Sequence, residues 1–312
     1  MIQGIPKISV TVITYNQEDV IRRAIDSLIA QRDYIYEICV SDDCSTDSTW
    51  DILQAYSKEY PDLFKLNRND PNICIFENIE KTWTMPSGDL VCSLAGDDAY
   101  VDGWFKGLID FILKNEIDYK NEAICIYGDY RAVYPNGDSF IFRNRMIQGG
   151  HPSLKLAIRG FIGNRSTCIS MKVLRQYVKV SKGRSYIAEQ AQDRQKQMFS
   201  KRNYYIPLVG NVYYARIGVS MHMDKKIRSD RSERWTYFEE VAEGQGVFLD
   251  KKDKAYLRAQ VAKEKGETFS KWKNWLMSIE PSLLFTSLKT RRYLFALIRR
   301  MPHSKPIVDY KL

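Results

Sequence analysis

The stretch that decides the fold runs from Ile8 to Asn16 and reads ISVTVITYN. Its first part, Ile8 to Ile13, is a run of apolar and β-branched residues, which is typical of a fully buried strand. The run stops at Thr14-Tyr15-Asn16, and apolar or small residues then recur at helical spacing from Val20 to Ile29. A buried strand followed by an amphipathic helix is the repeating unit of α/β sheets.

The same unit recurs along the next hundred residues. We predict further buried strands at Tyr36–Val40, Leu63–Leu66, Asp89–Leu94 and Ala123–Tyr127. Three helices are predicted between them. The first is capped by Ser45 or Thr46, and the other two span Phe76–Trp83 and Asp102–Lys114. This alternation predicts an open, mostly parallel sheet that is covered by helices on both faces.

The second half of the chain has a weaker pattern. An Asn136-Gly137 turn predicts a hairpin between Arg131–Tyr134 and Ser139–Phe142. A helix at Glu189–Arg202 and one or two strands at Tyr204–Val219 are expected next, followed by charged helical sequence from about Lys225.

Three polar clusters follow three of the predicted strands. They are Thr14-Tyr15-Asn16, Ser41-Asp42-Asp43 and Gly96-Asp97-Asp98. Ligands of open α/β sheets bind at the carboxyl ends of the strands. The sequence therefore predicts that the three polar clusters meet in one binding site.

The carboxylates of these clusters suggest two kinds of chemistry. Asp97 and Asp98 are suited to hold a hard cation such as Mg²⁺ or Mn²⁺, which prefers oxygen ligands; alternatively they cap the helix expected near Val101. Asp42 or Asp43 can accept the imide N–H of a uracil or thymine ring; alternatively both serve the turn that follows the strand.

The order and spacing of these motifs resemble the family 2 glycosyltransferases of the GT-A fold. The matching segments are ISVTVITYN at 8–16, EICVSDDCSTD at 37–47, Asn72 with Asn78, and GDLVCSLAGDD at 88–98. The resemblance is firm over residues 5–115 and weaker to about residue 220. It implies a Rossmann-like mixed sheet flanked by helices in a domain at 1–222, with a helical basic C-terminal region at 223–312.

The resemblance also implies roles for the residues of the polar clusters. Thr14, Tyr15 and Asn16 would line the nucleotide pocket, and Asp42 would bind the pyrimidine ring. The ribose and diphosphate would lie by Asp97, and Mn²⁺ or Mg²⁺ would be coordinated by Asp98. The chain departs from the family pattern at Ala95, where a further Asp is frequent, and at Cys44, where Gly is usual.

Inverting transfer needs a general base for the acceptor hydroxyl. By resemblance this base is Asp193, although Gln192 stands before it where the family often has Glu. Glu189 is the alternative, because it lies one helical turn away. His222, and more weakly Arg216, are expected to steady the metal or the diphosphate.

The implied activity is metal-dependent, inverting hexosyl transfer from a UDP- or dTDP-linked sugar to a glycan hydroxyl in polysaccharide biosynthesis. Fold-level analogy alone makes the acceptor a surface glycan or a lipid-linked glycan. Three alternatives stay open. They are a nucleotidyl- or phosphoryl-transferase, a catalytically degenerate GT-A scaffold, and a basic nucleic-acid-binding protein. The absence of a Gly-x-x-x-x-Gly-Lys loop from the sequence counts against a P-loop kinase.

The formal net charge of +9 is concentrated in the last hundred residues. Apolar and basic residues alternate at helical spacing over 282–300, which favours a helix lying in an anionic membrane interface; alternatively this helix docks on the catalytic domain. No nucleic-acid motif accompanies the charge, so no nucleic-acid partner is expected.

The remaining composition bears on location. We find no signal peptide at the N-terminus and no run of about 20 apolar residues. The six cysteines include no C-x-x-C pair, and Cys39, Cys92 and Cys125 lie inside apolar runs, which fits a reducing compartment. We therefore expect a cytoplasmic protein, with peripheral attachment to the inner face of the cytoplasmic membrane as an option.

Overall fold

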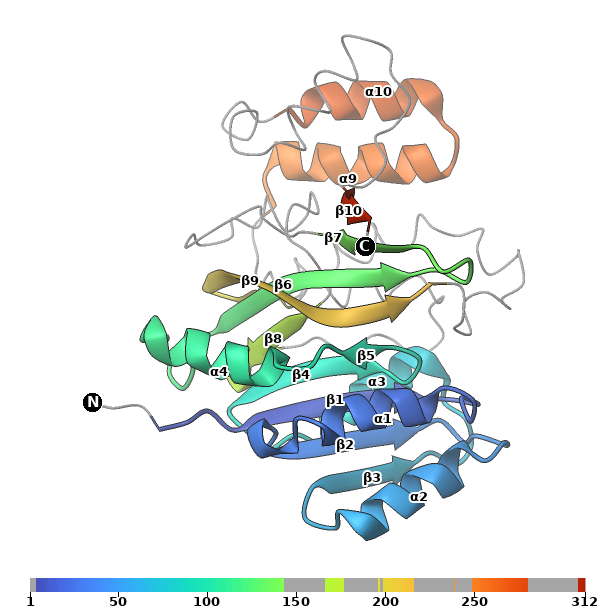
Figure 1. The fold of residues 1–312 in the computed structure, drawn as a ribbon. Coiled ribbons are helices and arrows are strands. Elements are labelled where there is room, and N and C mark those ends of the chain that lie inside the picture. Colours follow the sequence, from blue (N-terminus) through green and yellow to red (C-terminus); the bar gives the residue numbers. More distant parts are fainter. Residues whose placement is uncertain are drawn as a thin grey trace.

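A computed structural model describes residues 4–142, 166–176, 196, 199–215, 239, 249–279 and 308–311 of the chain. It contains a mixed β-sheet with helices packed on both faces and a helical region at one end (Figure 1). The strand order is β10-β7-β6-β8-β4-β1-β2-β3, and β9 pairs with both β5 and β6. The predicted Rossmann-like mixed sheet with flanking helices and a helical C-terminal extension is confirmed.

The bounds of the elements are as follows. The strands are β1 Ile8–Thr14, β2 Glu37–Asp42, β3 Phe64–Arg68, β4 Leu90–Ala95, β5 Ala99–Tyr100, β6 Ile124–Val133, β7 Ser139–Phe142, β8 Thr167–Ser170, β9 Arg202–Tyr214 and β10 Val308–Lys311. The helices are α1 Ile21–Ile29, η1 Arg32–Tyr34, α2 Thr49–Glu59, α3 Cys74–Trp83, α4 Trp104–Lys114, α6 Met171–Leu174, α9 Lys251–Glu264 and α10 Thr268–Met277.

Parallel pairing dominates the N-terminal half of the sheet and recurs between β6 and β9. Strands β3, β2, β1 and β4 are parallel, whereas β8 is antiparallel to both β4 and β6, and β7 is antiparallel to β6. The expectation of a mostly parallel sheet is therefore wrong for β5, β7, β8 and β10, whose pairing is antiparallel. The reason is local at β7, because the predicted hairpin forms with Gly137 at φ 83°, and a tight hairpin joins antiparallel strands.

Successive side chains of each strand point to opposite faces of the sheet, and each face has its own hydrophobic core. Ile8, Val10 and Val12 of β1 pack into the larger core, which α1, α2 and α4 cover. Val91 and Cys125, which point the other way, belong to a second core with side chains from α3, α6 and α9. Helix α9 is therefore anchored to the sheet through Leu257, which is 1% exposed.

The extents of one strand and one helix differ from the sequence prediction. The strands expected at Ala123–Tyr127 and Arg131–Tyr134 are one continuous strand, β6. Its pairing with β9 shifts register on both sides of Asp129, so the strand continues past Gly128 with an irregularity at that point. The helix expected to reach Arg202 also ends earlier, because Arg202 begins β9.

Some expectations lie outside the described residues. They concern Asp193, Glu189, Arg216, His222 and the amphipathic segment 282–300. The domain boundary at residue 222 also stays a prediction. Among the helices within the described ranges, none combines the length and apolar character needed to cross a membrane.

Replacing Gly128 with alanine should destabilise the sheet. A Cβ atom there would lie 2.6 Å from Trp104 Cζ3 and 2.7 Å from the Leu208 carbonyl oxygen, and the buried indole has little room to move. We expect a loss of about 1–3 kcal/mol in the free energy of unfolding, measured by urea denaturation. Gly4→Ala is the matched control, because nothing lies within 4 Å of a Cβ at Gly4. Equal urea midpoints for the two variants would contradict the prediction.

Candidate functional site

The register of the parallel strands brings the polar clusters together. Thr14 at the end of β1 pairs with Asp42 at the end of β2, and Asp42 pairs with Arg68 at the end of β3. On the other side of β1, Ile13 pairs with Ala95 at the end of β4. The loops that follow these four strands therefore start from one edge of the sheet, as their places in the sequence predict.

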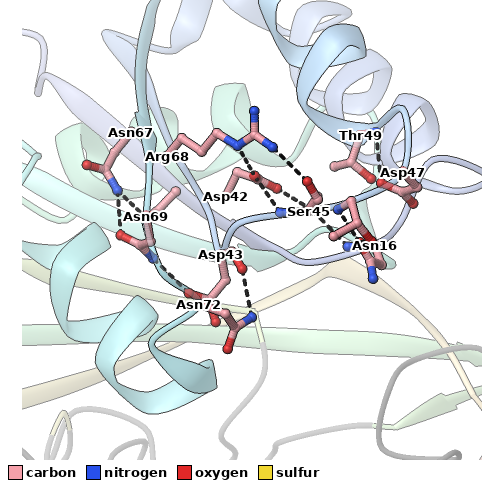
Figure 2. Close-up of polar contacts among 12 residues, drawn as sticks. Asn16, Asp42, Asp43, Ser45, Asp47, Thr49, Asn67, Arg68, Asn69 and Asn72 are labelled. Carbon is pink, nitrogen blue, oxygen red and sulfur yellow. Dashed lines mark hydrogen bonds and ion pairs between the residues drawn. The ribbon is translucent and has the colours of Figure 1, made fainter.

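Asn16 fastens the loop after β1 to the loop after β2. Its backbone is left-handed at φ 48°, its Oδ1 accepts from the Thr46 backbone N–H at 2.8 Å, and its own N–H donates to Ser45 Oγ at 2.9 Å (Figure 2). The Gln17 N–H donates to Thr49 Oγ1 at 2.8 Å. These bonds hold the first two polar clusters in one arrangement.

The other two residues of the first polar cluster differ in exposure. Thr14 is 3% exposed, and its hydroxyl donates to Gln17 Oε1 at 2.8 Å. Tyr15 is half-buried, so part of its ring remains accessible at the sheet edge. Of the two, Tyr15 has the accessible surface that contact with a nucleobase requires.

The cap of α2 is not the predicted one. The helix begins at Thr49, and neither Ser45 nor Thr46 caps it. Instead Asp47 Oδ1 accepts from the Thr49 N–H at 3.0 Å, and Glu18 Oε2 reaches across from the first loop to accept from the Ser48 N–H at 2.9 Å. The first turn of α2 therefore depends on the neighbouring loop.

Asp42 is a buried carboxylate at the centre of this edge. Its side chain is fully buried, Oδ2 accepts from the Ser45 N–H at 3.0 Å, and Oδ1 accepts from the Ser45 hydroxyl. Arg68 Nε lies 3.6 Å from Oδ2. Burial raises the pKa of Asp42, although the bonds from Ser45 and the charge of Arg68 act in the opposite direction. The group thus serves the turn and also carries a charge that burial disfavours.

Asp43 organises the loop after β3. Its Oδ1 accepts from Asn69 Nδ2 and from the Ile73 N–H, both at 2.9 Å, and its carbonyl accepts from Asn72 Nδ2 at 2.7 Å (Figure 2). Asn69 Nδ2 also donates to Asn78 Oδ1 at 2.9 Å. The two asparagines of the family resemblance, Asn72 and Asn78, therefore both belong to the network that holds the second polar cluster.

Arg68 belongs to this edge although sequence reasoning missed it. Its side chain is 41% exposed, Nη2 donates to the Ser45 carbonyl at 2.8 Å, and the guanidinium lies 5.5 Å from the centroid of the Trp50 ring. It is a cation that touches both Asp42 and open solvent. The signal was present, because polar residues follow β3 just as they follow β1, β2 and β4.

The third polar cluster is held by β9. Asp98 is 5% exposed, and its Oδ1 accepts from the Tyr214 N–H at 3.1 Å. A Cβ at Gly96 would collide with Gln17 Oε1 and lie 3.1 Å from the Ile13 carbonyl, so the close approach of the loops requires glycine there. The alternative that these aspartates cap a helix is wrong, because α4 begins at Trp104 after Gly103.

Arg23 is a second cation that the sequence did not reveal. Its Nη2 donates to the Asp97 carbonyl at 2.6 Å, and its guanidinium carbon lies 3.5 Å from the centroid of the Tyr214 ring. It therefore joins α1, the third polar cluster and the end of β9. Tyr214 was not predicted because nothing in the sequence indicates where the long strand β9 ends.

The described residues of the third polar cluster suit a metal ion that takes few of its ligands from the protein. In the part of the chain that the structure describes, no three His, Cys, Asp or Glu side chains gather in one place. Asp98 is a single carboxylate oriented by Tyr214, and a hard cation bound there would take its other ligands from a diphosphate and water. Asp193, Glu189 and His222 lie outside the described residues, so their distances to this edge stay untested.

Solved structures establish the type of fold. The fragment 1–349 of TarS from S. aureus is similar to this chain with a TM-score of 0.56 and 14% identity, over 97% of this chain and 94% of that one. The same fragment in complex with UDP-GlcNAc gives a TM-score of 0.56 with 13% identity, over 97% and 95% of the two chains. At such identities the likeness concerns the fold, which is the predicted GT-A fold.

The sequence comparisons establish the family. The model described as "Glycosyl transferase family 2" matches residues 9–173, which is more than half of the chain. The chain belongs to this family. Relatives include the uncharacterized protein Rv1520 of Mycobacterium tuberculosis, 35% identical over 41% of this chain and 36% of its own length, and the dTDP-rhamnosyl transferase RfbG of Shigella flexneri, 32% identical over 40% and 42%. The chain thus spans less than half the length of these relatives.

Removing the charge of Asp42 should increase stability at neutral pH. Burial raises its pKa in the folded state, so ionisation of Asp42 lowers stability as pH rises above the unfolded value of about 3.9. We expect Asp42→Asn to have a urea midpoint at or above that of the native protein at pH 7, with the difference shrinking towards pH 4. An amide still has an oxygen to accept from the Ser45 N–H.

Asp43→Ala should have the opposite effect. It removes the acceptor of Asn69 Nδ2 and of the Ile73 N–H, a loss of about 1–3 kcal/mol for each buried donor left unpaired. The same urea titrations measure both variants. A loss of stability in Asp42→Asn at pH 7 would show that the ion pair with Arg68 outweighs burial.

Proposed function

We propose that the chain transfers a sugar from a nucleoside-diphosphate sugar to a glycan hydroxyl with inversion at the anomeric carbon. The observation that carries the proposal is the meeting of the three polar clusters at one sheet edge, in a chain of glycosyl transferase family 2. Ligands of such sheets bind at this edge. The alternative is a catalytically degenerate GT-A scaffold, and nucleotide binding together with the rate of sugar transfer distinguishes it from an active transferase.

The donor nucleotide is a pyrimidine, UDP or dTDP. Tyr15 and Asn16 line its base, and the Asp42 carboxylate accepts the imide N–H after its contact with Ser45 rearranges. Support comes from the names of similar proteins, since RfbG is a dTDP-rhamnosyl transferase and TarS has a complex with UDP-GlcNAc. Burial raises the pKa of Asp42, and the charge of Arg68 opposes this effect because a cation favours the ionised carboxylate.

The diphosphate lies between the first and third polar clusters. Asp97 faces the ribose and diphosphate, and Asp98, with His222 as a second candidate, holds Mn²⁺ or Mg²⁺. The ion would supply positive charge that offsets the charge developing on the diphosphate. Arg23 fixes the backbone at Asp97, so the loop keeps its place when a charged ligand binds.

The transfer step needs a base on the acceptor side. The acceptor oxygen bonds to the anomeric carbon as the bond from that carbon to the diphosphate oxygen breaks, and the electron pair leaves with the diphosphate. Asp193 takes the hydroxyl proton in this proposal, and Glu189 is the alternative base. The acceptor is a glycan or lipid-linked glycan of a cell-surface polysaccharide, and the enzyme works in the cytoplasm on the inner face of the membrane.

Calorimetric titration with UDP, dTDP and GDP, with and without Mn²⁺, tests the donor site. We expect UDP or dTDP to bind more tightly with Mn²⁺, and Asp42→Ala to weaken binding roughly 10- to 100-fold, the loss expected for a charged hydrogen bond. Asp98→Asn should abolish the effect of Mn²⁺. Asp51→Ala, an exposed acid on α2, is the matched control.

Each other outcome of this titration has a meaning. Binding of GDP in place of UDP and dTDP would contradict the role of Asp42 and keep the transferase proposal. A full effect of Mn²⁺ in Asp98→Asn would contradict the metal site. The absence of binding to all three nucleotides would favour the degenerate scaffold.

Replacement of the proposed base should affect the rate more than the binding of donor. We expect Asp193→Asn to bind the nucleotide as the native protein does and to lower kcat by roughly 100- to 10,000-fold, the usual contribution of general base catalysis. The measurement is release of nucleoside diphosphate in the presence of acceptor. Glu189→Gln is the matched control, and a rate loss confined to that variant would make Glu189 the base.

A further inference from the structure

Helix α10 has its apolar side turned outward. Phe269 is 83% exposed, Leu276 61%, Met277 56% and Trp272 42%. Positions 269, 272 and 276 share one side of a helix, because they are three and four residues apart. We call these four side chains, with Ile279 just beyond the end of the helix, the outer face of α10.

The packed side of the same helix is mostly polar, with Trp275 as a half-buried aromatic residue there. Ser278 is buried, and Ser270 and Asn274 are half-buried, with Asn274 Nδ2 donating to the Ser270 carbonyl at 2.9 Å. Helices α10 and α9 lie side by side, and α9 is anchored to the core through Leu257 (Figure 1). The helix is thus amphipathic in the reverse of the usual sense, with its polar side against the protein.

An outward apolar face of this kind indicates an apolar partner. A surface helix normally buries its apolar side, and exposed large hydrophobic side chains that gather in one place mark interaction surfaces. Within the described part of the chain no residue covers Phe269. The hydrophobic effect is non-directional and does not distinguish a lipid surface from another protein. The charged residues around the outer face provide that distinction.

The charge around the outer face is net positive, because three exposed lysines outnumber the exposed Glu267 at the start of α10. Lys263 and Lys265, which precede α10, and Lys273 on its outward side are all exposed. Aromatic and aliphatic side chains bordered by lysines are the combination that an anionic lipid surface binds.

We propose that the outer face of α10 docks the protein on an anionic lipid bilayer. Phe269, Trp272 and Leu276 enter the boundary between headgroups and acyl chains, and Lys263, Lys265 and Lys273 contact the headgroups. A second copy of the chain would bring these lysines against their like charges. Nucleic acid would engage the lysines but give no role to Leu276 and Met277. This docking goes beyond sugar transfer and does not depend on it.

Co-sedimentation of the full chain with vesicles tests the proposal. The probes are vesicles of phosphatidylcholine alone and of phosphatidylcholine mixed with phosphatidylglycerol in equal parts. We expect binding to the anionic vesicles, lost by about 10-fold or more in Phe269→Ser/Trp272→Ser/Leu276→Ser. The Lys263→Gln/Lys265→Gln/Lys273→Gln variant should lose about fivefold per lysine and the salt dependence of binding.

Matched variants remove exposed residues of the same kinds elsewhere. The apolar control is Ile5→Ser/Tyr34→Ser/Leu113→Ser, and the basic control is Lys58→Gln/Lys81→Gln/Lys114→Gln. Both should bind anionic vesicles as the native protein does. Circular dichroism and the thermal midpoint verify that every variant folds, which is expected because all substituted side chains are exposed.

Three outcomes would overturn the docking proposal. They are unchanged vesicle binding by the α10 serine variant, equal binding to neutral and anionic vesicles, and self-association in solution that the serine variant abolishes. Transfer to a soluble acceptor should be the same in the native protein and in the serine variant. A protein that docks on vesicles but transfers no sugar would contradict the proposed function and leave the docking intact.

Discussion

The parallel register of β1 with β2 on one side and β4 on the other is the constraint on which the site depends. It sets Thr14 beside Asp42 and Ile13 beside Ala95, so three loops leave the sheet together. Parallel strands require crossover connections, and the helices α1, α2 and α3 supply these connections between β1 and β4. The apolar residues of β1 thus do two things, since they form the core and also place the polar residues that follow.

The polar network turns this placement into a fixed geometry. Backbone N–H groups of one loop bond to side chains of another, as between Thr46 and Asn16 and between Ser48 and Glu18. Asp42 and Asp43 are buried among these bonds, although burial of a carboxylate opposes folding. A fold that keeps the Asp42 carboxylate buried at a sheet edge accepts a loss of stability there, which is typical of sites that bind a ligand.

The sequence predicts those parts of the fold in which local pattern and tertiary structure agree. Strands β1, β2 and β4 are largely buried runs rich in apolar residues, and each ends at a polar cluster, so both their type and their common edge could be inferred. The sequence divides strand β6 in two at Gly128, and this glycine is explained by two distant residues, because the Trp104 indole and the Leu208 carbonyl leave no room for a Cβ atom. Arg23 and Tyr214 were missed because residues distant in the sequence form their contact.

The helices α1 and α10 show why an amphipathic pattern alone does not fix the buried side. In α1 the apolar residues Ile25 and Leu28 are fully buried, as the pattern predicts, whereas in α10 the apolar residue Phe269 is the most exposed. The sequence pattern shows which residues share one side of the helix, but it does not show which side faces the rest of the protein. In α1 the sheet covers the apolar side. In α10 the less exposed side is mostly polar, with Ser270 and Asn274 beside Trp275, so burial of Phe269 requires a surface outside the described chain.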